Sequence, residues 1–219
     1  MKKTLLFVCL LALCNLTMYG QTEGRPRIGH TVVHTKEKSA THVPPQKAPA
    51  GLKKIYSNLG TSVDLYDDLA GWTIEGPNVN GFSIFGAIPF TPKSNSHVFQ
   101  VGAAVHYFNG DNQVNISIYT DANGVPGALL AGPVTVTNVP EAGTCCTLAV
   151  ANFAPLAVAG GTQYWVVVDT PLTGTGSDFA GEWDMVAGIV PISFNDDGDG
   201  WAADTANDLP AGAVLGTTP

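Results

Sequence analysis

Hydrophobic and polar residues alternate along much of the chain from residue 55 onward, and this two-residue period is typical of half-buried β-strands. The alternation is strictest over residues 113–120, whereas residues 163–168 are apolar on both faces, as in a central strand. Further strand patterns cover residues 72–75, 82–90, 99–107, 134–139, 147–151, 189–194 and 213–215. The sequence therefore predicts an all-β fold, a two-sheet antiparallel sandwich of about nine strands, either jelly-roll or fibronectin-like.

Local patterns refine this prediction. The turn signal Asn-Gly-Asp-Asn at 109–112 predicts that the strands before and after it pair as a hairpin. In the first of these strands, alternate apolar residues from Phe99 to Tyr107 form one face, so His106 falls on the other face and is expected to be exposed. Tyr164 follows Gly-Gly-Thr-Gln at the start of its strand and looks like a tyrosine corner, whose hydroxyl bonds to the backbone upstream.

The first 54 residues differ in composition from the rest of the chain. Two lysines precede an apolar run over residues 4–14, which predicts a signal peptide at 1–20 and is too short to span a bilayer. A lipoprotein anchored at Cys14 is the weaker alternative, because the small residue expected just before a lipidated cysteine is missing. Residues 21–54 are basic, proline-rich and aperiodic, and they predict a disordered linker or propeptide.

These boundaries leave a β-sandwich domain at 55–219. We expect the protein to be secreted, periplasmic or held at the cell surface, with no transmembrane segment in the mature chain. Residues 21–54, which we call the tail, contain His30, His34 and His42. These histidines are expected to be solvated rather than metal-binding, because no scaffold fixes their geometry.

Charge is divided unevenly along the chain. The formal net charge of the whole chain is −8, yet from residue 55 onward Lys93 is the one basic residue against sixteen acidic ones. An acidic domain repels phosphate groups, so the composition argues against a nucleic-acid partner.

An ordered set of short motifs points to a family. The motifs are Asp-Leu-Ala-Gly-Trp-Thr-Ile at 68–74, Ile-Pro-Phe-Thr-Pro at 88–92, Ser-Ile-Tyr-Thr-Asp at 117–121 with Gly-Val-Pro-Gly at 124–127, Gly-Thr-Cys-Cys at 143–146, and Ala-Gly-Gly-Thr-Gln-Tyr-Trp-Val at 159–166. Together they resemble the bacterial exported choice-of-anchor sandwich domains, which are often associated with a PEP-CTERM sorting tail. The resemblance implies export and a sandwich fold, and it implies no particular activity.

The tryptophans suggest a binding function. Trp183 and Trp201 lie in loop-like or turn-flanked surroundings, so they are the candidates to offer flat apolar faces to the sugar rings of an extracellular glycan. Trp72 and Trp165 could offer such faces as well, but large aromatic residues of a sandwich usually lie in the core, and this is the expectation for Trp165. The sequence thus favours a secreted, non-catalytic module that binds extracellular polysaccharide, and a purely structural or adhesive surface protein is the alternative.

An enzyme is less favoured. The chain contains no His-Glu-x-x-His, Gly-x-Ser-x-Gly or glycine-rich phosphate loop, so no catalytic residue is predicted. Asp178, Glu182 and Asp184 could supply the facing carboxylates of a glycoside hydrolase, but acidic clusters arise by chance in so acidic a domain.

A structural calcium site is the one cofactor predicted. Asn195, Asp197 and Asp199 place oxygen-bearing side chains at alternate positions before a glycine, as at the start of an EF-hand loop. The position of the bidentate glutamate in such a loop is taken by Ala206, and an ordinary acidic hairpin turn is the alternative.

The cysteines give a further prediction. Cys9 and Cys14 lie in the signal peptide, so the mature chain keeps two adjacent cysteines, Cys145 and Cys146. In an oxidising compartment these predict a vicinal disulfide, the alternative being two buried thiols.

Overall fold

The computed structural model describes residues 31–33, 50–60, 65–172, 176–187, 194–196, 200–203 and 208–218. The predicted signal peptide lies outside these ranges, as does most of the predicted linker. The described residues form fifteen strands and one short helix, α1 (Pro77–Asn80). The predicted all-β fold class is confirmed, with more strands than the nine expected from the sequence. Within this part of the chain, no helix is long and apolar enough to cross a membrane.

The strands form three antiparallel sheets. The six-stranded sheet has the order β13 (Ala202–Ala203), β12 (Phe194–Asp196), β4 (Phe85–Phe90), β10 (Tyr164–Asp169), β7 (Gln113–Asp121) and β8 (Pro126–Thr137). The four-stranded sheet has the order β2 (Lys53–Ser57), β15 (Gly212–Thr217), β5 (Ser96–Ala103) and β9 (Ala149–Val158). The five-stranded sheet contains β1 (Thr31–Val33), β3 (Asp67–Glu75), β11 (Ala180–Ala187) and β14 (Asp208–Pro210), with β6 (Val105–Asn109) also paired to β11.

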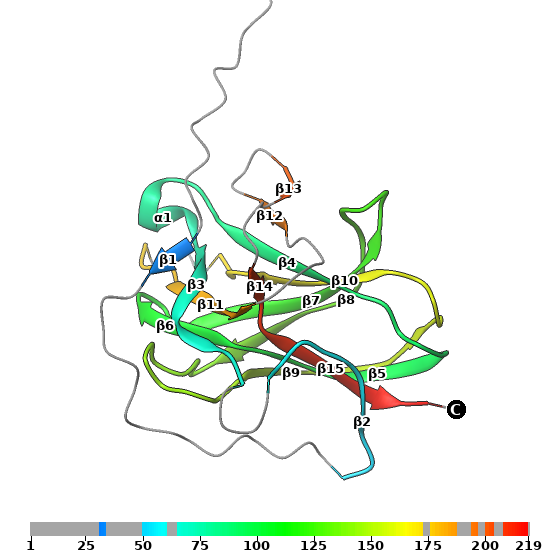
Figure 1. Ribbon diagram of the computed structural model, residues 1–219. Coiled ribbons are helices and arrows are strands. Elements are labelled where there is room, and N and C mark those ends of the chain that lie inside the picture. Colours follow the sequence, from blue (N-terminus) through cyan, green and yellow to red (C-terminus); the bar gives the residue numbers. More distant parts are fainter. Residues whose placement is uncertain are drawn as a thin grey trace, which may run out of the picture.

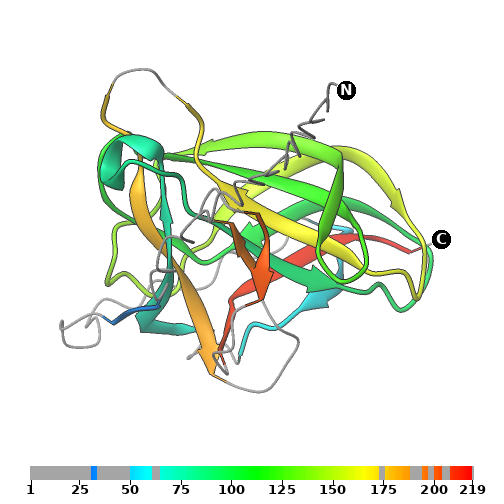
Figure 2. The ribbon, with the colours of Figure 1, turned by 90° about the horizontal axis from the view of Figure 1, so that it is seen from above.

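The six-stranded and four-stranded sheets stack as the two layers of a sandwich (Figure 1). The apolar half of each alternating pattern faces inward, and it supplies the buried core residues Ile88, Val114, Ile116, Ile118, Val166 and Val168 from one layer and Val98, Val101, Ala151 and Val214 from the other. As predicted, β10 is a central strand, because it pairs with both β4 and β7. The five-stranded sheet lies at one end of this sandwich, at the left in both Figure 1 and Figure 2.

The chain passes between the four-stranded and the five-stranded sheet at two positions. The chain changes sheet at Ala104, between β5 and β6, and again at Ala211, between β15 and β14. The backbone of Asp184 in β11 closes this corner: its N–H donates to the carbonyl of Ala104 at 2.9 Å, and its carbonyl accepts from the N–H of Ala211 at 2.7 Å. The corner therefore fixes β11, and the side chains that β11 carries, relative to both sheets.

This change of sheet makes the predicted hairpin at 109–112 wrong. The strand before the turn, β6, pairs with β11, whereas the strand after it, β7, pairs with β10 and β8. The single predicted face from Phe99 onward is also interrupted, because the pairing of β5 with β9 shifts register between Val98 and Gln100. A turn signal in the sequence marks a change of direction, but it does not say which strands pair across it.

The predicted linker contributes to the fold. Residues 31–33, which fall in the segment expected to be disordered, form β1 and pair with β3. Strand β2 begins at Lys53, before the predicted domain boundary, and pairs with β15.

The tyrosine corner is confirmed. The backbone N–H of Ala159 donates to the Tyr164 hydroxyl at 3.0 Å, five residues upstream of the tyrosine. The hydroxyl thus holds the loop that leads from β9 into β10, which is a structural role.

Candidate functional site

The outer face of the six-stranded sheet carries the polar half of the β7 pattern. Its residues on β7 are Asn115, Ser117, Tyr119 and Asp121, which alternate with the buried residues of the core. On the neighbouring strand β10 the same face carries Trp165, Val167 and Asp169, which lie opposite Tyr119, Ser117 and Asn115 in turn. The antiparallel register therefore brings aromatic and hydrogen-bonding side chains together on one surface.

An aromatic group lies on this outer face. Trp165 forms a small apolar cluster with Ala87 and Val167, separate from the main core, and the side chains of Tyr119 and Trp201 lie against it. Trp165 is buried, whereas Tyr119 and Trp201 are each partly exposed. Strands β12 and β13 extend the six-stranded sheet beyond β4, and they lie above β4 in Figure 1. Trp201, directly before β13, packs against the cluster that contains Trp165 and stays partly exposed.

The Asp121 carboxylate fixes the orientation of Trp165. Its Oδ1 accepts hydrogen bonds from the indole Nε1 of Trp165 at 2.9 Å and from Nε2 of Gln163 at 2.8 Å. Both carboxylate oxygens also accept from the backbone N–H of Gly124, at 3.2 and 3.1 Å. Burial alone would raise the pKa of Asp121, but the hydrogen bonds from Trp165, Gly124 and Gln163 outweigh it and leave the pKa lowered. An ionised Asp121 thus holds both the indole ring and the β7–β8 turn.

A second carboxylate lies further along the same face. Oδ1 of Asp169 accepts a hydrogen bond from Nδ2 of Asn115 at 2.8 Å, and the hydroxyl of Thr135 donates to Oδ1 of Asn115 at 2.8 Å. Burial raises the pKa of Asp169 to about 6, against the opposing effect of the Asn115 hydrogen bond. The pKa of Tyr119 is raised by burial and by the charge of Asp169. We call this surface the sheet-face site, and its accessible members are Asn115, Tyr119, Asp121, Gln163, Asp169 and Trp201.

Replacing Asp121 with alanine is expected to lower the free energy of unfolding by about 2 kcal/mol, because hydrogen bonds to a charged acceptor are the stronger ones. Urea unfolding followed by tryptophan fluorescence measures the change. Asp121→Asn keeps one acceptor oxygen and should fall between the wild type and Asp121→Ala. A change below about 0.5 kcal/mol in the alanine variant would show that the carboxylate does not hold the turn.

The structure separates the two tryptophans predicted to bind glycan. Trp201 is partly exposed at the sheet-face site. Trp183 is 0% exposed, and its indole Nε1 donates to the carbonyl of Ala211 at 2.8 Å inside the core. The prediction that Trp183 offers its ring to a ligand is therefore wrong. Its segment forms the inner strand β11 of the five-stranded sheet rather than a loop. Trp165 is buried, as expected, and Trp72 is buried as well.

The predicted calcium site falls largely outside the described residues. Asn195 lies in β12, where it pairs with Gly86 of β4 and Ala202 of β13. Asp197 and Asp199 lie in a segment that the structure does not describe. Calcium at this loop stays a prediction.

The adjacent cysteines are buried and bonded. The structure joins the sulfur atoms of Cys145 and Cys146 in a vicinal disulfide across a cis peptide bond. Cys145 is 5% exposed and Cys146 is 0% exposed. The disulfide belongs to the loop between β8 and β9, which also contacts Tyr66 through the carbonyl of Thr147.

A cluster of ionisable residues lies buried near the corner of the two joined sheets. His106, Glu182 and Asp184 are each 0% exposed, and Nδ1 of His106 lies 2.7 Å from Oδ2 of Asp184. The expectation that His106 is exposed is therefore wrong. It does lie on the face opposite its core neighbour Val105, but that face is covered by Tyr66.

The same burial weakens the glycoside hydrolase alternative. Its three candidate acids are enclosed, since Asp178 is 2% exposed and the other two are 0% exposed. A carboxylate that acts on a polysaccharide must reach the glycosidic bond. These carboxylates are not placed to do so in this structure.

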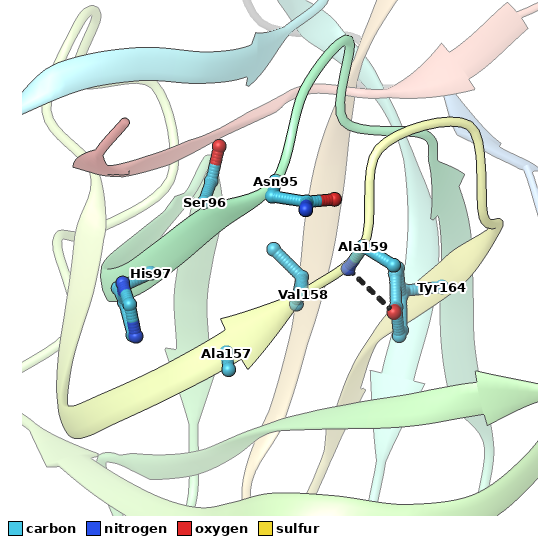
Figure 3. Close-up of a pocket in the computed structure, with 7 residues that line it drawn as sticks. All are labelled: Asn95, Ser96, His97, Ala157, Val158, Ala159 and Tyr164. Atoms are coloured by element: carbon cyan, nitrogen blue, oxygen red, sulfur yellow. Dashed lines mark hydrogen bonds between the residues drawn. The ribbon is translucent and has the colours of Figure 1, made fainter. Parts of the chain in front are cut away.

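A shallow hollow of about 350 Å³ lies at the tyrosine corner (Figure 3). Most of its polar groups already hold the surrounding loops: Asn95 accepts from the N–H of Gly160, Ser96 donates to the carbonyl of Ser94, and Tyr164 accepts from Ala159. The exposed imidazole of His97 completes the lining. With no aromatic face open beside several polar groups, this hollow is a weaker candidate than the sheet-face site.

No protein-family model and no curated protein matches this chain. Among solved structures, it is similar to the cysteine protease and lectin-like domains of Cwp84, a surface layer associated protein of Clostridium difficile, with 12% sequence identity and a TM-score of 0.49. The similarity covers 79% of this chain and 37% of that chain, so the chain spans little more than a third of the structure it matches.

Proposed function

We propose that this protein is an extracellular, non-catalytic module that binds a neutral polysaccharide on the sheet-face site. The observation that carries the proposal is the pair of partly exposed aromatic rings, Tyr119 and Trp201, beside hydrogen-bonding side chains on one sheet surface. Sugar rings have apolar faces that lie against aromatic rings, and their hydroxyl groups bond to carboxylates and amides at the edges.

The geometry of the strands supports an extended ligand. Tyr119 and Asn115 are four residues apart on the same face of β7, and they are therefore separated by about 13 Å along the strand. Asp121 and Gln163 lie at the aromatic end of this row, and Asp169 lies at the other end. A row of polar groups of this length suits several consecutive sugar units better than a single small molecule.

The rigidity of the surface also supports binding. Asp121 holds the indole of Trp165, and Asn115 is held between Asp169 and Thr135. Side chains fixed before binding lose less conformational entropy when the ligand arrives. The charge of the domain selects among polymers, because sixteen acidic residues against one lysine after residue 55 repel an anionic polysaccharide.

The test is retention of the protein by immobilised neutral polysaccharides, such as glucans, mannans, xylan and chitin, with acidic alginate as the negative comparison. Tyr119→Ala and Trp201→Ala are each expected to weaken binding about tenfold, which corresponds to a loss of about 1.4 kcal/mol. Phe108→Ala is the matched control, because Phe108 is an aromatic residue 38% exposed on β6, in a different sheet.

Thermal melting of each variant separates loss of the site from loss of the fold. If the wild type binds no polymer of the panel, or if a variant with both Tyr119→Ala and Trp201→Ala binds as tightly as the wild type, the proposal is wrong. The first of these outcomes would favour a structural or adhesive surface protein instead.

A further inference from the structure

The buried cluster at the corner of the joined sheets contains the kinds of ligand that a divalent transition metal prefers. His106 on β6 and Glu182 on β11 are direct neighbours in the strand register, and Asp184 follows two residues later on the same strand. Each of these residues offers one ligand atom, and the three atoms lie within 4.8 Å of one another. Imidazole nitrogen and carboxylate oxygen are both zinc ligands, and a tetrahedral ion held by three side chains leaves its fourth position to a water molecule.

We propose that His106, Glu182 and Asp184 form a structural site for one divalent transition cation, of which zinc is the best match. Ligands at about 2.1 Å from a tetrahedral zinc ion lie about 3.4 Å from each other, so small side-chain rotations suffice to close the present arrangement around an ion. Calcium fits this cluster less well, because it takes six to eight oxygen ligands.

The burial of the three side chains supports the proposal, because a metal ion that binds buried carboxylates offsets part of the cost of removing them from water. In the structure, the contact of 2.7 Å between His106 and Asp184 holds two of the ligands close together.

The surrounding strands leave space for the cluster. A Cβ atom on Gly71 of β3 would lie 2.8 Å from Oε2 of Glu182, so the glycine provides the room that this carboxylate occupies. On the other side, the hydroxyl of Tyr66 lies 3.4 Å from Nε2 of His106 and donates to the carbonyl of Thr147 at 2.8 Å. The site therefore connects β6 and β11 of the five-stranded sheet with the loop that carries the vicinal disulfide, and an ion there would stabilise both parts.

The experiment uses the secreted protein, loaded by dialysis against zinc and then dialysed against metal-free buffer. Mass spectrometry of the metal content is expected to find about one zinc ion per chain, as for a structural site. The melting temperature in zinc should exceed that in a strong chelator by about 5 °C or more. Loading with cobalt instead should give the visible absorption of a tetrahedral site.

Matched variants identify the ligands. Glu182→Gln and Asp184→Asn should each lower the retained zinc to below about a tenth of the wild-type content. Glu75→Gln should retain it, because Glu75 is also buried, at 4% exposed, but accepts from Nδ2 of Asn80 away from the cluster. A triple variant of the tail, with His30, His34 and His42 changed to alanine, should retain it as well.

Three results would overturn the proposal. A wild type that retains no zinc and melts at the same temperature in zinc and in chelator would overturn it. So would a Glu182→Gln protein that retains zinc as the wild type does, or loss of the zinc in the tail variant. If the cluster variants fail to fold, the stoichiometry and melting shift of the wild type and of the tail variant still decide.

Discussion

Trp183→Ala is expected to destabilise the protein by about 3–5 kcal/mol, which is the range for removal of a large buried aromatic side chain. Trp183 is 0% exposed, and its ring lies so close to β4 that a Cβ atom added to Gly86 would be 3.1 Å from it. The substitution also removes the hydrogen bond from the indole to the carbonyl of Ala211, where the chain passes between sheets. Chemical denaturation at neutral pH measures the loss.

Two variants give this prediction its controls. Trp183→Phe keeps most of the apolar volume but loses the hydrogen bond, so it should cost less than the alanine variant. Leu172→Ala should change the free energy of unfolding by less than about 0.5 kcal/mol, because Leu172 is 79% exposed. If Trp183→Ala were as stable as the wild type, the burial of this tryptophan would be contradicted. Because the loss of Trp183 is expected to destabilise the fold itself, a Trp183 variant is unsuitable for testing the sheet-face site.

Asp169→Asn is expected to stabilise the protein at neutral pH and to change its pH dependence. Burial raises the pKa of Asp169 from its ordinary value of 3.8 to about 6. Between these two values the folded protein binds a proton at Asp169 that the unfolded chain does not bind. The contribution of Asp169 to stability therefore falls as the pH rises from about 4 to about 6, and the penalty stays constant above pH 6.

The asparagine variant has no such penalty, and its Oδ1 can still accept the hydrogen bond from Asn115. The difference in the free energy of unfolding between variant and wild type should be close to zero below about pH 4 and reach at most about 3 kcal/mol above pH 6, since one pKa unit corresponds to about 1.4 kcal/mol. Urea unfolding at a series of pH values measures this difference. Glu141→Gln, at an exposed acid, is the control. A difference that does not vary with pH would mean that the pKa of Asp169 is not raised in the folded protein.

The alternating pattern was sufficient to predict the fold class and much of the strand inventory. It predicted β7 and the central position of β10, because the period of two and the continuous apolar run are local properties of the sequence. Tyr164 was predictable for the same reason, since its partner Ala159 lies only five residues away. The alternation also marked Asn115, Tyr119 and Asp121 as one polar face, and the pattern could have identified them as site candidates.

The tertiary structure decided which of these faces are covered and which distant residues meet. An alternating strand has two faces whether or not a second layer lies over its polar face, so the sequence could not show that His106 is enclosed by Tyr66. Asp121 receives hydrogen bonds from residues 42 and 44 positions away, and only the pairing of β7 with β10 brings them together. The buried cluster has the same origin, because the corner at Ala104 places His106 beside β11 instead of beside β7. The sequence thus determined the strands and their two faces through local periodicity, whereas strand pairing across long separations determined the sites.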